Sequence, residues 1–282
     1  MHLSLDYTPR CPQKEQPFTE SSFVRKSISV PFEPTEIGVA LVDLWNLGWP
    51  EGPISNTLGE ALSLERGRSH ADRKQRIIEQ KIAPTVNTLR AKGIRIFHCN
   101  HAEILARYKQ GASARNNLKT DSIRTEPDTE PQDCSGDETT HQWPPREWVA
   151  DWQREHREQI WAHESWGKLQ GKEVYPQIRI PEPVQPQKDD ILVSTHQEFH
   201  ERLAERKIRI LLYMGFETDE CVVNSDYGIV NMKQYGYLCI IVRDCTTTYE
   251  LAETAEGLWK TRVAIANIEA NHGYSTTSER LI

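Results

Sequence analysis

One cysteine of this chain lies where a thiol could act as a nucleophile. Cys221 follows an apolar run over 208–214 and a turn that begins at Gly215. Thr218 or Asp219 is the expected N-cap of a helix that starts at the cysteine. The N–H groups at a helix start stabilise a thiolate, lower the pKa of the thiol, and can bind the oxyanion that forms on an attacked carbonyl. The alternative is that Cys221 is a small buried apolar residue, as many free cysteines are.

One carboxylate near the start of the chain could serve as the base. Asp43 follows the apolar run 37–42, and Trp45 and Asn46 come directly after it. A continuous apolar run is typical of a parallel strand that is covered on both faces. Ligands bind beyond the carboxyl ends of such strands, so we expect Asp43 and Cys221 to meet there. The alternative for Asp43 is a carboxylate that caps a helix or bonds to a loop.

The elements that must position these two residues alternate along the chain. Apolar runs predict strands over 37–42, 94–99, 190–194, 208–214 and 237–242. Helices are predicted over 70–91 with a kink or break at Pro84, and over 102–109, 197–206, 221–235 and 248–262. Residues 263–268 could form a last strand or continue the preceding helix, and 274–282 read as a polar tail. This alternation predicts an α/β sandwich with a mostly parallel sheet.

Two separated motifs resemble the isochorismatase-like cysteine hydrolases, a family that includes nicotinamidases, N-carbamoylsarcosine amidases and isochorismatase. The first is I-G-V-A-L-V-D-L-W-N at 37–46. The second has the form G-F-x-T-x-x-C-V, then a helix, G-Y, a strand and R-D, and it is carried by Gly215, Thr218, Cys221, Val222, Gly236, Tyr237 and Asp244. The resemblance covers about 36–105 and 188–270. It implies a three-layer α/β/α sandwich with a mostly parallel central sheet, in a single hydrolase-like domain over 36–282.

The resemblance also implies a reaction, the cleavage of a small amide or related C–N bond through a thioester. In the family a carboxylate takes the thiol proton, and backbone N–H groups hold the oxyanion. The corresponding residues here are Asp43 as base, Cys221 as nucleophile, and the N–H groups of Glu217 and Cys221 as oxyanion donors. The Phe216–Glu217 peptide bond is expected to be cis, as it is in the family. The residues that we expect to contact substrate are Trp45, Asn46, His101 and Phe216.

The chain departs from the family pattern at its third residue, a lysine after the strand 190–194. Ser194 or Thr195 stands at that place. His196 is the nearest residue that could carry the positive charge and is our third candidate catalytic residue. Lys168 or Lys172 could also supply it.

The turn before the cysteine adds an acidic cluster, Glu217, Asp219 and Glu220. If these side chains face the sulfur, they raise the pKa of the thiol and oppose its activation. Other functions therefore stay open beside the amide hydrolase. One is a small-molecule binding or scaffold protein that is catalytically weak or inactive, for which a thiol pKa above the usual value would argue. The other is a vinyl-ether hydrolase, in which Asp43 alone protonates the substrate.

Residues 110–187 are predicted to be an insertion into the α/β domain. The segment 120–140 is acidic and rich in Ser, Thr and Pro, whereas 143–166 is rich in tryptophan. Trp148 and Trp152 are four residues apart and would share one helix face. The insertion could form a small satellite core, or a lid that gives the site an aromatic wall.

Composition limits the partners of the chain. The net charge of −7 over 282 residues argues against nucleic-acid binding, and no apolar stretch approaches a membrane span of roughly 18 residues. The six cysteines form no CxxC pair, which favours reduced thiols and a cytoplasmic protein. Residues 1–35 read as an arm that packs on the surface or on a neighbouring subunit. The resemblance implies a small-molecule substrate and, because related proteins pair or form tetramers, a homo-oligomer.

No metal and no cofactor is expected. His98 and His101 are three residues apart near the end of the strand 94–99, so their side chains should point to opposite faces. Their sequence context also has no Asp at the place that a metal-binding relative would need. His101 is therefore expected to form part of a polar wall beside the site.

Overall fold

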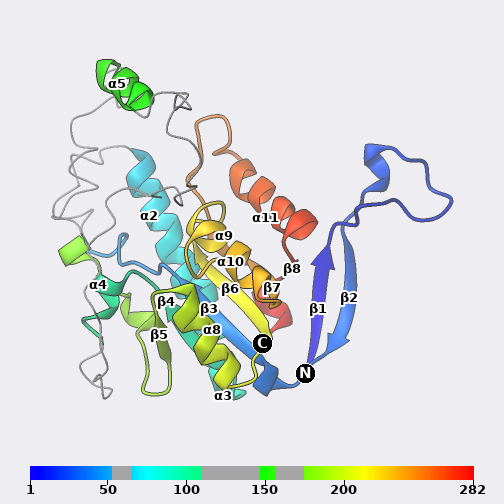
Figure 1. The fold of residues 1–282 in the computed structure, drawn as a ribbon, viewed down its shortest axis with the longest axis horizontal. Helices are drawn as coiled ribbons and strands as arrows, with labels where there is room; N and C mark the ends of the chain where they lie inside the picture. The colour runs from blue at the N-terminus through cyan, green and yellow to red at the C-terminus, as the bar shows by residue number, and fades with distance from the viewer. Residues whose placement is uncertain (53–64, 109–146, 157–174) are drawn as a thin grey trace, which may run out of the picture.

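An eight-stranded sheet runs through the computed structural model, which describes residues 1–52, 65–108, 147–156 and 175–282. Its order is β2-β1-β8-β7-β6-β3-β4-β5 (Figure 1). The strands are β1 (His2–Tyr7), β2 (Lys26–Pro31), β3 (Ile37–Val42), β4 (Arg95–Cys99), β5 (Ile191–Val193), β6 (Ile210–Phe216), β7 (Leu238–Thr247) and β8 (Tyr274–Thr276). Every pair from β5 across to β8 is parallel, whereas β1 pairs antiparallel with both β8 and β2.

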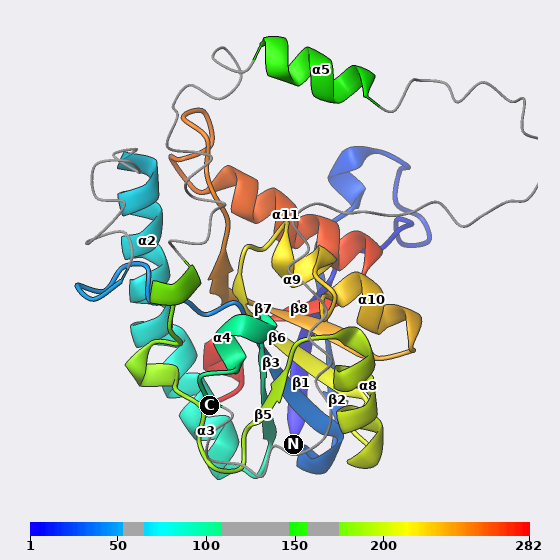
Figure 2. The same ribbon diagram turned by 60° about the vertical axis from the view of Figure 1, so that its left-hand side comes forward.

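Helices cover both faces of the sheet, whereas α5 (Trp148–Glu155) lies away from it (Figure 2). The other described helices are α2 (Glu65–Ile77), α3 (Ala83–Ala91), α4 (Ala102–Leu105), α8 (His196–Glu205), α9 (Cys221–Asn224), α10 (Ile229–Gln234) and α11 (Trp259–Asn271). Strand β6 shows the layering, because successive side chains of a strand point to opposite faces. Leu212 packs in the cluster that holds α2 and α3, whereas Leu211 and Tyr213 pack in the cluster that holds α8, α10 and α11. The expected α/β sandwich with a mostly parallel sheet is confirmed.

The sequence predicted a kink or a break at Pro84, and the regular α-helix is interrupted next to this residue. A π-helical turn, η3 (Ile78–Ile82), separates α2 from α3, and Pro84 is the second residue of α3. Proline has no N–H to donate, and its ring crowds the carbonyl one turn earlier, so a regular α-helix cannot continue through it.

Other boundaries differ from the prediction. The expected helix 221–235 is two short helices, α9 and α10, with a connection at 225–228. The helix expected over 248–262 begins only at Trp259, because Gly257 and Leu258 adopt positive φ angles of 79° and 53°. Residues 263–268 therefore continue this helix and form no strand.

Both ends of the chain join the sheet. Residues from the segment 1–35, which we expected to form an arm, supply β1 and β2, and the expected polar tail supplies β8. These strands carry several Ser and Thr residues and lie toward one edge of the sheet, so the apolar-run criterion did not find them. The core is therefore larger than the sequence pattern indicated.

The described parts of the segment 110–187 differ from each other. Ile178, Ile180 and Val184 are buried in the same core as the central strands. In α5, Trp148 is 58% exposed and Trp152 is 45% exposed. The segment 120–140 and the residues Trp143, Trp161 and Trp166 lie outside the described residues, so the satellite core and the lid both stay predictions.

None of the helices described is long and apolar enough to cross a lipid bilayer.

Candidate active site

The candidate site lies where β3 and β6 end side by side. Val42 pairs with Gly215, and Asp43 follows with a positive φ of 47°. Gly215 has a φ of 137°, and a Cβ atom there would lie 2.0 Å from the carbonyl oxygen of Val42. Glycine is thus required for the close approach of the two strands. This approach brings Asp43 beside the turn that leads to Cys221.

Asp43 is a buried carboxylate with few partners. It is 3% exposed, and its Oδ1 accepts a hydrogen bond from the hydroxyl of Tyr227 at 2.7 Å. Its Oδ2 is buried and meets no nitrogen or oxygen donor among the residues described. Burial raises the pKa of Asp43, although His101, Tyr227 and Cys221 favour its charged form. Asp43 is therefore more basic than an exposed aspartate.

Cys221 is partly exposed and interacts with the Asp43 carboxylate. Burial and the negative charge of Asp43 raise the pKa of the thiol, and the charge of Glu217 acts in the same direction. The N–H of Glu217 bonds to the sulfur and acts in the opposite direction. The sequence left the direction of this shift open, and the structure gives a raised thiol pKa, because burial beside two carboxylates outweighs the N–H groups at the start of the one-turn helix α9.

The turn between β6 and α9 carries the expected cis peptide bond at Phe216–Glu217. Phe216 is buried, and the N–H of Glu217 lies at the sulfur of Cys221. One of the two expected oxyanion donors thus lies beside the candidate nucleophile. The other is the N–H of Cys221 itself.

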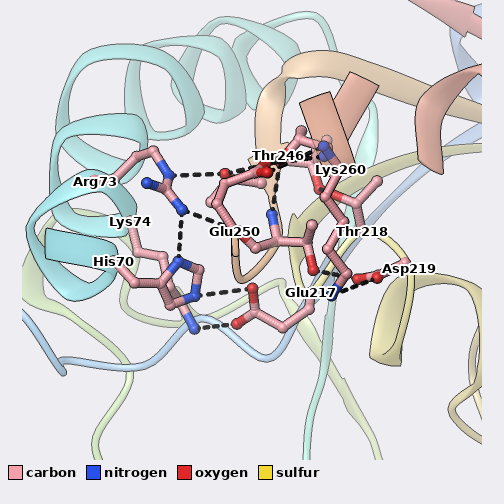
Figure 3. A network of polar contacts seen from close by, with 12 residues as sticks. His70, Arg73, Lys74, Glu217, Thr218, Asp219, Thr246, Glu250 and Lys260 are labelled. Carbon is pink, nitrogen blue, oxygen red and sulfur yellow. Dashed lines mark hydrogen bonds and ion pairs between the residues drawn. The ribbon is translucent and has the colours of Figure 1, made fainter. Parts of the chain in front are cut away.

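The side chain of Glu217 is held by two residues of α2 (Figure 3). Its Oε1 lies 2.7 Å from Lys74 Nζ, and its Oε2 lies 2.9 Å from His70 Nε2. Arg73 approaches His70 Nδ1 at 3.0 Å and can only donate there, so His70 carries its proton on Nε2, toward Glu217. Burial lowers the pKa of His70, which fits a neutral ring.

Lys74 is a buried cation that we did not identify from the sequence. Burial alone would lower its pKa, but the Glu217 carboxylate outweighs burial and raises it, so Lys74 is charged. Its Nζ lies 4.9 Å from the ring centre of Phe216 and 5.8 Å from that of Trp45, and it interacts electrostatically with both Asp43 and Cys221. Its position in the sequence could have indicated that it is buried, because Lys74 lies one turn before the apolar stripe of the helix and on the same face.

The place expected for the family lysine is used to begin α8. Thr195 Oγ1 accepts the N–H of Glu198, and Glu198 Oε2 accepts the N–H of Ser194. His196 Nδ1 lies 2.7 Å from Asp226 Oδ1, and its side chain is 42% exposed. No contact between described residues joins His196 to the Asp43–Cys221 pair. The alternatives Lys168 and Lys172 lie outside the described residues.

The remaining candidate residues surround the end of β3. Trp45 Nε1 donates to Asn100 Oδ1 at 3.0 Å, and the Trp45 ring lies 5.7 Å from that of His101. Asn46 is buried and exchanges hydrogen bonds with the backbone of Arg179. It therefore fixes the segment 175–180 to the site, while its Nδ2 has no partner among the residues described.

Asp219 of the acidic turn is directed away from the sulfur. Asp219 binds Lys260 Nζ at 2.9 Å and accepts a hydrogen bond from Thr248, so it faces α11 and the end of β7 (Figure 3). Within the described ranges, no group of three or more His, Cys, Asp or Glu side chains could hold a metal ion.

The fold and the site define an α/β protein with a thiol and a carboxylate at the carboxyl edge of its sheet. In a comparison with family profiles, residues 61–271 match the isochorismatase domain. This range is well over half of the chain, which therefore belongs to the isochorismatase family of hydrolases. The match includes Lys74 and Cys221 and begins after Asp43.

Several solved structures are similar to this chain over most of their length. A cysteine hydrolase from Pseudomonas syringae pv. phaseolicola 1448A is 13% identical, with 89% of this chain and 95% of that chain covered and a TM-score of 0.47. An isochorismatase family protein from Burkholderia thailandensis is 14% identical, with 87% and 93% covered and a TM-score of 0.42. The nicotinamidase from Staphylococcus aureus is 12% identical, with 84% and 94% covered and a TM-score of 0.37. A comparison with curated proteins found no match.

Proposed function

We propose that this chain is a cysteine hydrolase that cleaves a small amide or a related C–N bond. The observation that carries the proposal is the pairing of Cys221 with Asp43. The thiol is partly exposed, Oδ2 of the buried carboxylate has no nitrogen or oxygen donor among the described residues, and the N–H of Glu217 lies at the sulfur. These are the parts that covalent acyl transfer needs.

In the proposed reaction the Sγ–H bond of Cys221 breaks and its proton forms an O–H bond on Asp43. The sulfur electron pair attacks the carbonyl carbon, and the resulting oxyanion accepts hydrogen bonds from the N–H groups of Glu217 and Cys221. The C–N bond then breaks, and the amine leaves with the proton from Asp43. Water hydrolyses the thioester, which releases the acid and restores the thiol.

Lys74 has an electrostatic role in this scheme. Glu217 carries a buried carboxylate on the same residue whose N–H would bind the oxyanion. An unpaired negative charge there would destabilise the oxyanion, because the effective dielectric constant of a buried site is low. The ion pair with Lys74 removes most of this repulsion. Lys74 thus supplies from the helix α2 the positive charge that other family members supply from a lysine after the strand that corresponds to β5.

A trapped intermediate tests the proposal. The protein is incubated with a panel of small amides, and the mass of the Cys221 peptide is measured after rapid acid quenching. We expect an acyl adduct on Cys221 with at least one amide, none in Cys221→Ala, and far less in Asp43→Asn. Absence of adduct and of acid product over the whole panel would contradict amide hydrolysis.

One observation favours a second candidate function. The raised pKa of Cys221 leaves the thiol protonated at neutral pH, as expected for a pocket that binds a small molecule without attacking it. In that case amide analogues bind, their affinity is equal in Cys221→Ala, and no product forms.

The raised pKa of Asp43 favours one further chemistry. A buried aspartate that holds its proton can act as a general acid, which is what vinyl-ether cleavage by Asp43 alone requires. Vinyl-ether cleavage that survives Cys221→Ala but not Asp43→Asn would support this function over amide hydrolysis.

A further inference from the structure

Tyr227 is a buried tyrosine that reaches the candidate base from the connection between α9 and α10. Its hydroxyl donates to Asp43 Oδ1 at 2.7 Å, and both side chains are buried. The backbone of Tyr227 is itself fixed, because its carbonyl oxygen accepts the hydroxyl of Tyr213 at 3.1 Å. The next residue, Gly228, leaves no room for a Cβ atom, which would lie 2.7 Å from the carbonyl oxygen of Val223. The phenol is therefore held rigidly against the carboxylate.

The two oxygens of Asp43 are thereby made different. Oδ1 is occupied by the phenol, whereas Oδ2 meets no nitrogen or oxygen donor in the described part of the chain. The thiol that interacts with this carboxylate is that of Cys221. We propose that Tyr227 is a positioning residue that holds Oδ1 of Asp43 and so keeps Oδ2 available for the proton of Cys221. This inference rests on the proposed hydrolase function.

A phenol and a lysine would position the carboxylate with different chemical results. An ammonium adds a full positive charge, which lowers the basicity of a neighbouring carboxylate strongly. A phenol adds a single neutral hydrogen bond and leaves Asp43 more basic. Burial and the charge of Asp43 raise the pKa of Tyr227 well above its usual value, so the phenol keeps its proton and remains a donor. Tyr227 therefore takes over the orienting task of the family lysine, while the positive charge is supplied separately by Lys74.

Several titratable groups face Asp43, and a test must leave all but one of them in place. They come from α2, from β4 and the residues after it, and from the segment that begins at α9: Lys74, Cys99, His101, Cys221 and Tyr227. The substitution Tyr227→Phe removes one hydroxyl and none of the charges. A change in the protonation of Asp43 in this variant is then due to the lost hydrogen bond.

The experiment is the rate at which iodoacetamide alkylates Cys221, measured by peptide mass spectrometry from acid to alkaline pH. The first inflection of this profile reports ionisation of Asp43, because only an ionised Asp43 can accept the thiol proton. In Tyr227→Phe we expect this inflection to move to higher pH by about one unit. The control Tyr237→Phe removes a hydroxyl that bonds to His200 instead, and its profile should equal that of the wild type.

A second substitution has the opposite expected sign. A fluorinated tyrosine placed at position 227 is a stronger donor, so the first inflection should move to lower pH. The fluorinated variant keeps the hydrogen bond. If thermal unfolding shows that Tyr227→Phe does not fold, the fluorinated variant alone tests the role of Tyr227. An unchanged inflection in a folded variant of either kind would overturn the proposal.

The alkylation profile needs no substrate, so it separates this inference from the proposed function. If the inflection moves but no amide gives an adduct on Cys221, Tyr227 positions Asp43 in a protein that is not an amide hydrolase. If adducts form and the inflection does not move, hydrolysis stands and the role of Tyr227 fails.

Discussion

Two buried aspartates, one on a strand of the sheet and one directly after a strand, have pKa values shifted in opposite directions. Asp6 on β1 is 2% exposed, and Asp43 at the end of β3 is 3% exposed. Burial would raise the pKa of both. Hydrogen bonds from Ser27, Arg280 and Arg243 outweigh burial at Asp6 and lower its pKa to about 2, whereas at Asp43 burial prevails and the pKa is raised.

The difference shows that burial alone does not identify a functional carboxylate. Asp6 joins β1 to β2 through Ser27 and to the C-terminal part of the chain through two arginines. Its charge is fully compensated, and it holds the edge of the sheet together. Asp43 accepts a hydrogen bond from one neutral hydroxyl, and its Oδ2 has no nitrogen or oxygen donor among the described residues, so it can accept a proton. The number of donors around each carboxylate therefore separates a structural role from a catalytic one.

The largest expected effect comes from removing the base. Asp43→Asn should lower kcat/KM for any amide that is cleaved on the order of a hundred- to ten-thousand-fold. The free energy of unfolding should stay equal or rise slightly, because the buried carboxylate has few partners to lose. Steady-state kinetics and chemical denaturation measure the two effects. A strongly destabilised variant would mean that Asp43 is structural, like Asp6.

The next largest effect, on stability rather than on kcat/KM, is expected from Lys74→Met. This change leaves the Glu217 carboxylate buried without its cation, which should lower the free energy of unfolding by about 3 kcal/mol. The double variant Lys74→Met with Glu217→Gln removes the unpaired charge and should recover most of this loss in urea denaturation. If the double variant is no more stable than the single one, the ion pair does not govern this turn.

Asp6→Asn is the matched change at the structural carboxylate. We expect a loss of about 2 kcal/mol in the free energy of unfolding, since hydrogen bonds to charged groups are lost. Strands β8, β7 and β6 separate β1 from β3, so kcat/KM of the folded fraction should equal that of the wild type. A loss of activity at full folding would show that the two regions are coupled.

The pH dependence of stability should show the same contrast on a smaller scale. The folded-state pKa of Asp6 is lowered, so its contribution is present above about pH 3.9 and is lost as the pH falls toward about 2. The folded-state pKa of Asp43 is raised, so its contribution is present below about pH 3.9 and is lost as the pH rises. The Tm difference between Asp43→Asn and the wild type should therefore grow with rising pH, and that of Asp6→Asn should shrink with falling pH. Equal pH profiles for the two variants would contradict the contrast.

The sequence identified candidate catalytic residues where a reactive side chain comes directly after an apolar strand or its turn. Asp43 and Cys221 could be found because each comes directly after a buried strand or its turn. Lys74 and Tyr227 could not be assigned, because the rotation of α2 and the break between α9 and α10 decide where their side chains point. The strands β1, β2 and β8 were missed for a related reason, since their pairing partners are distant in sequence and their residues are largely polar.

The most direct test of the Asp43–Cys221 pair is the pH profile of Cys221 alkylation in Asp43→Asn beside the wild type. We predict that the wild type shows a first inflection from Asp43 and that this inflection disappears in Asp43→Asn, where only the thiol itself titrates. An identical profile in the two proteins would mean that the carboxylate does not take the thiol proton, and it would contradict the account of this site.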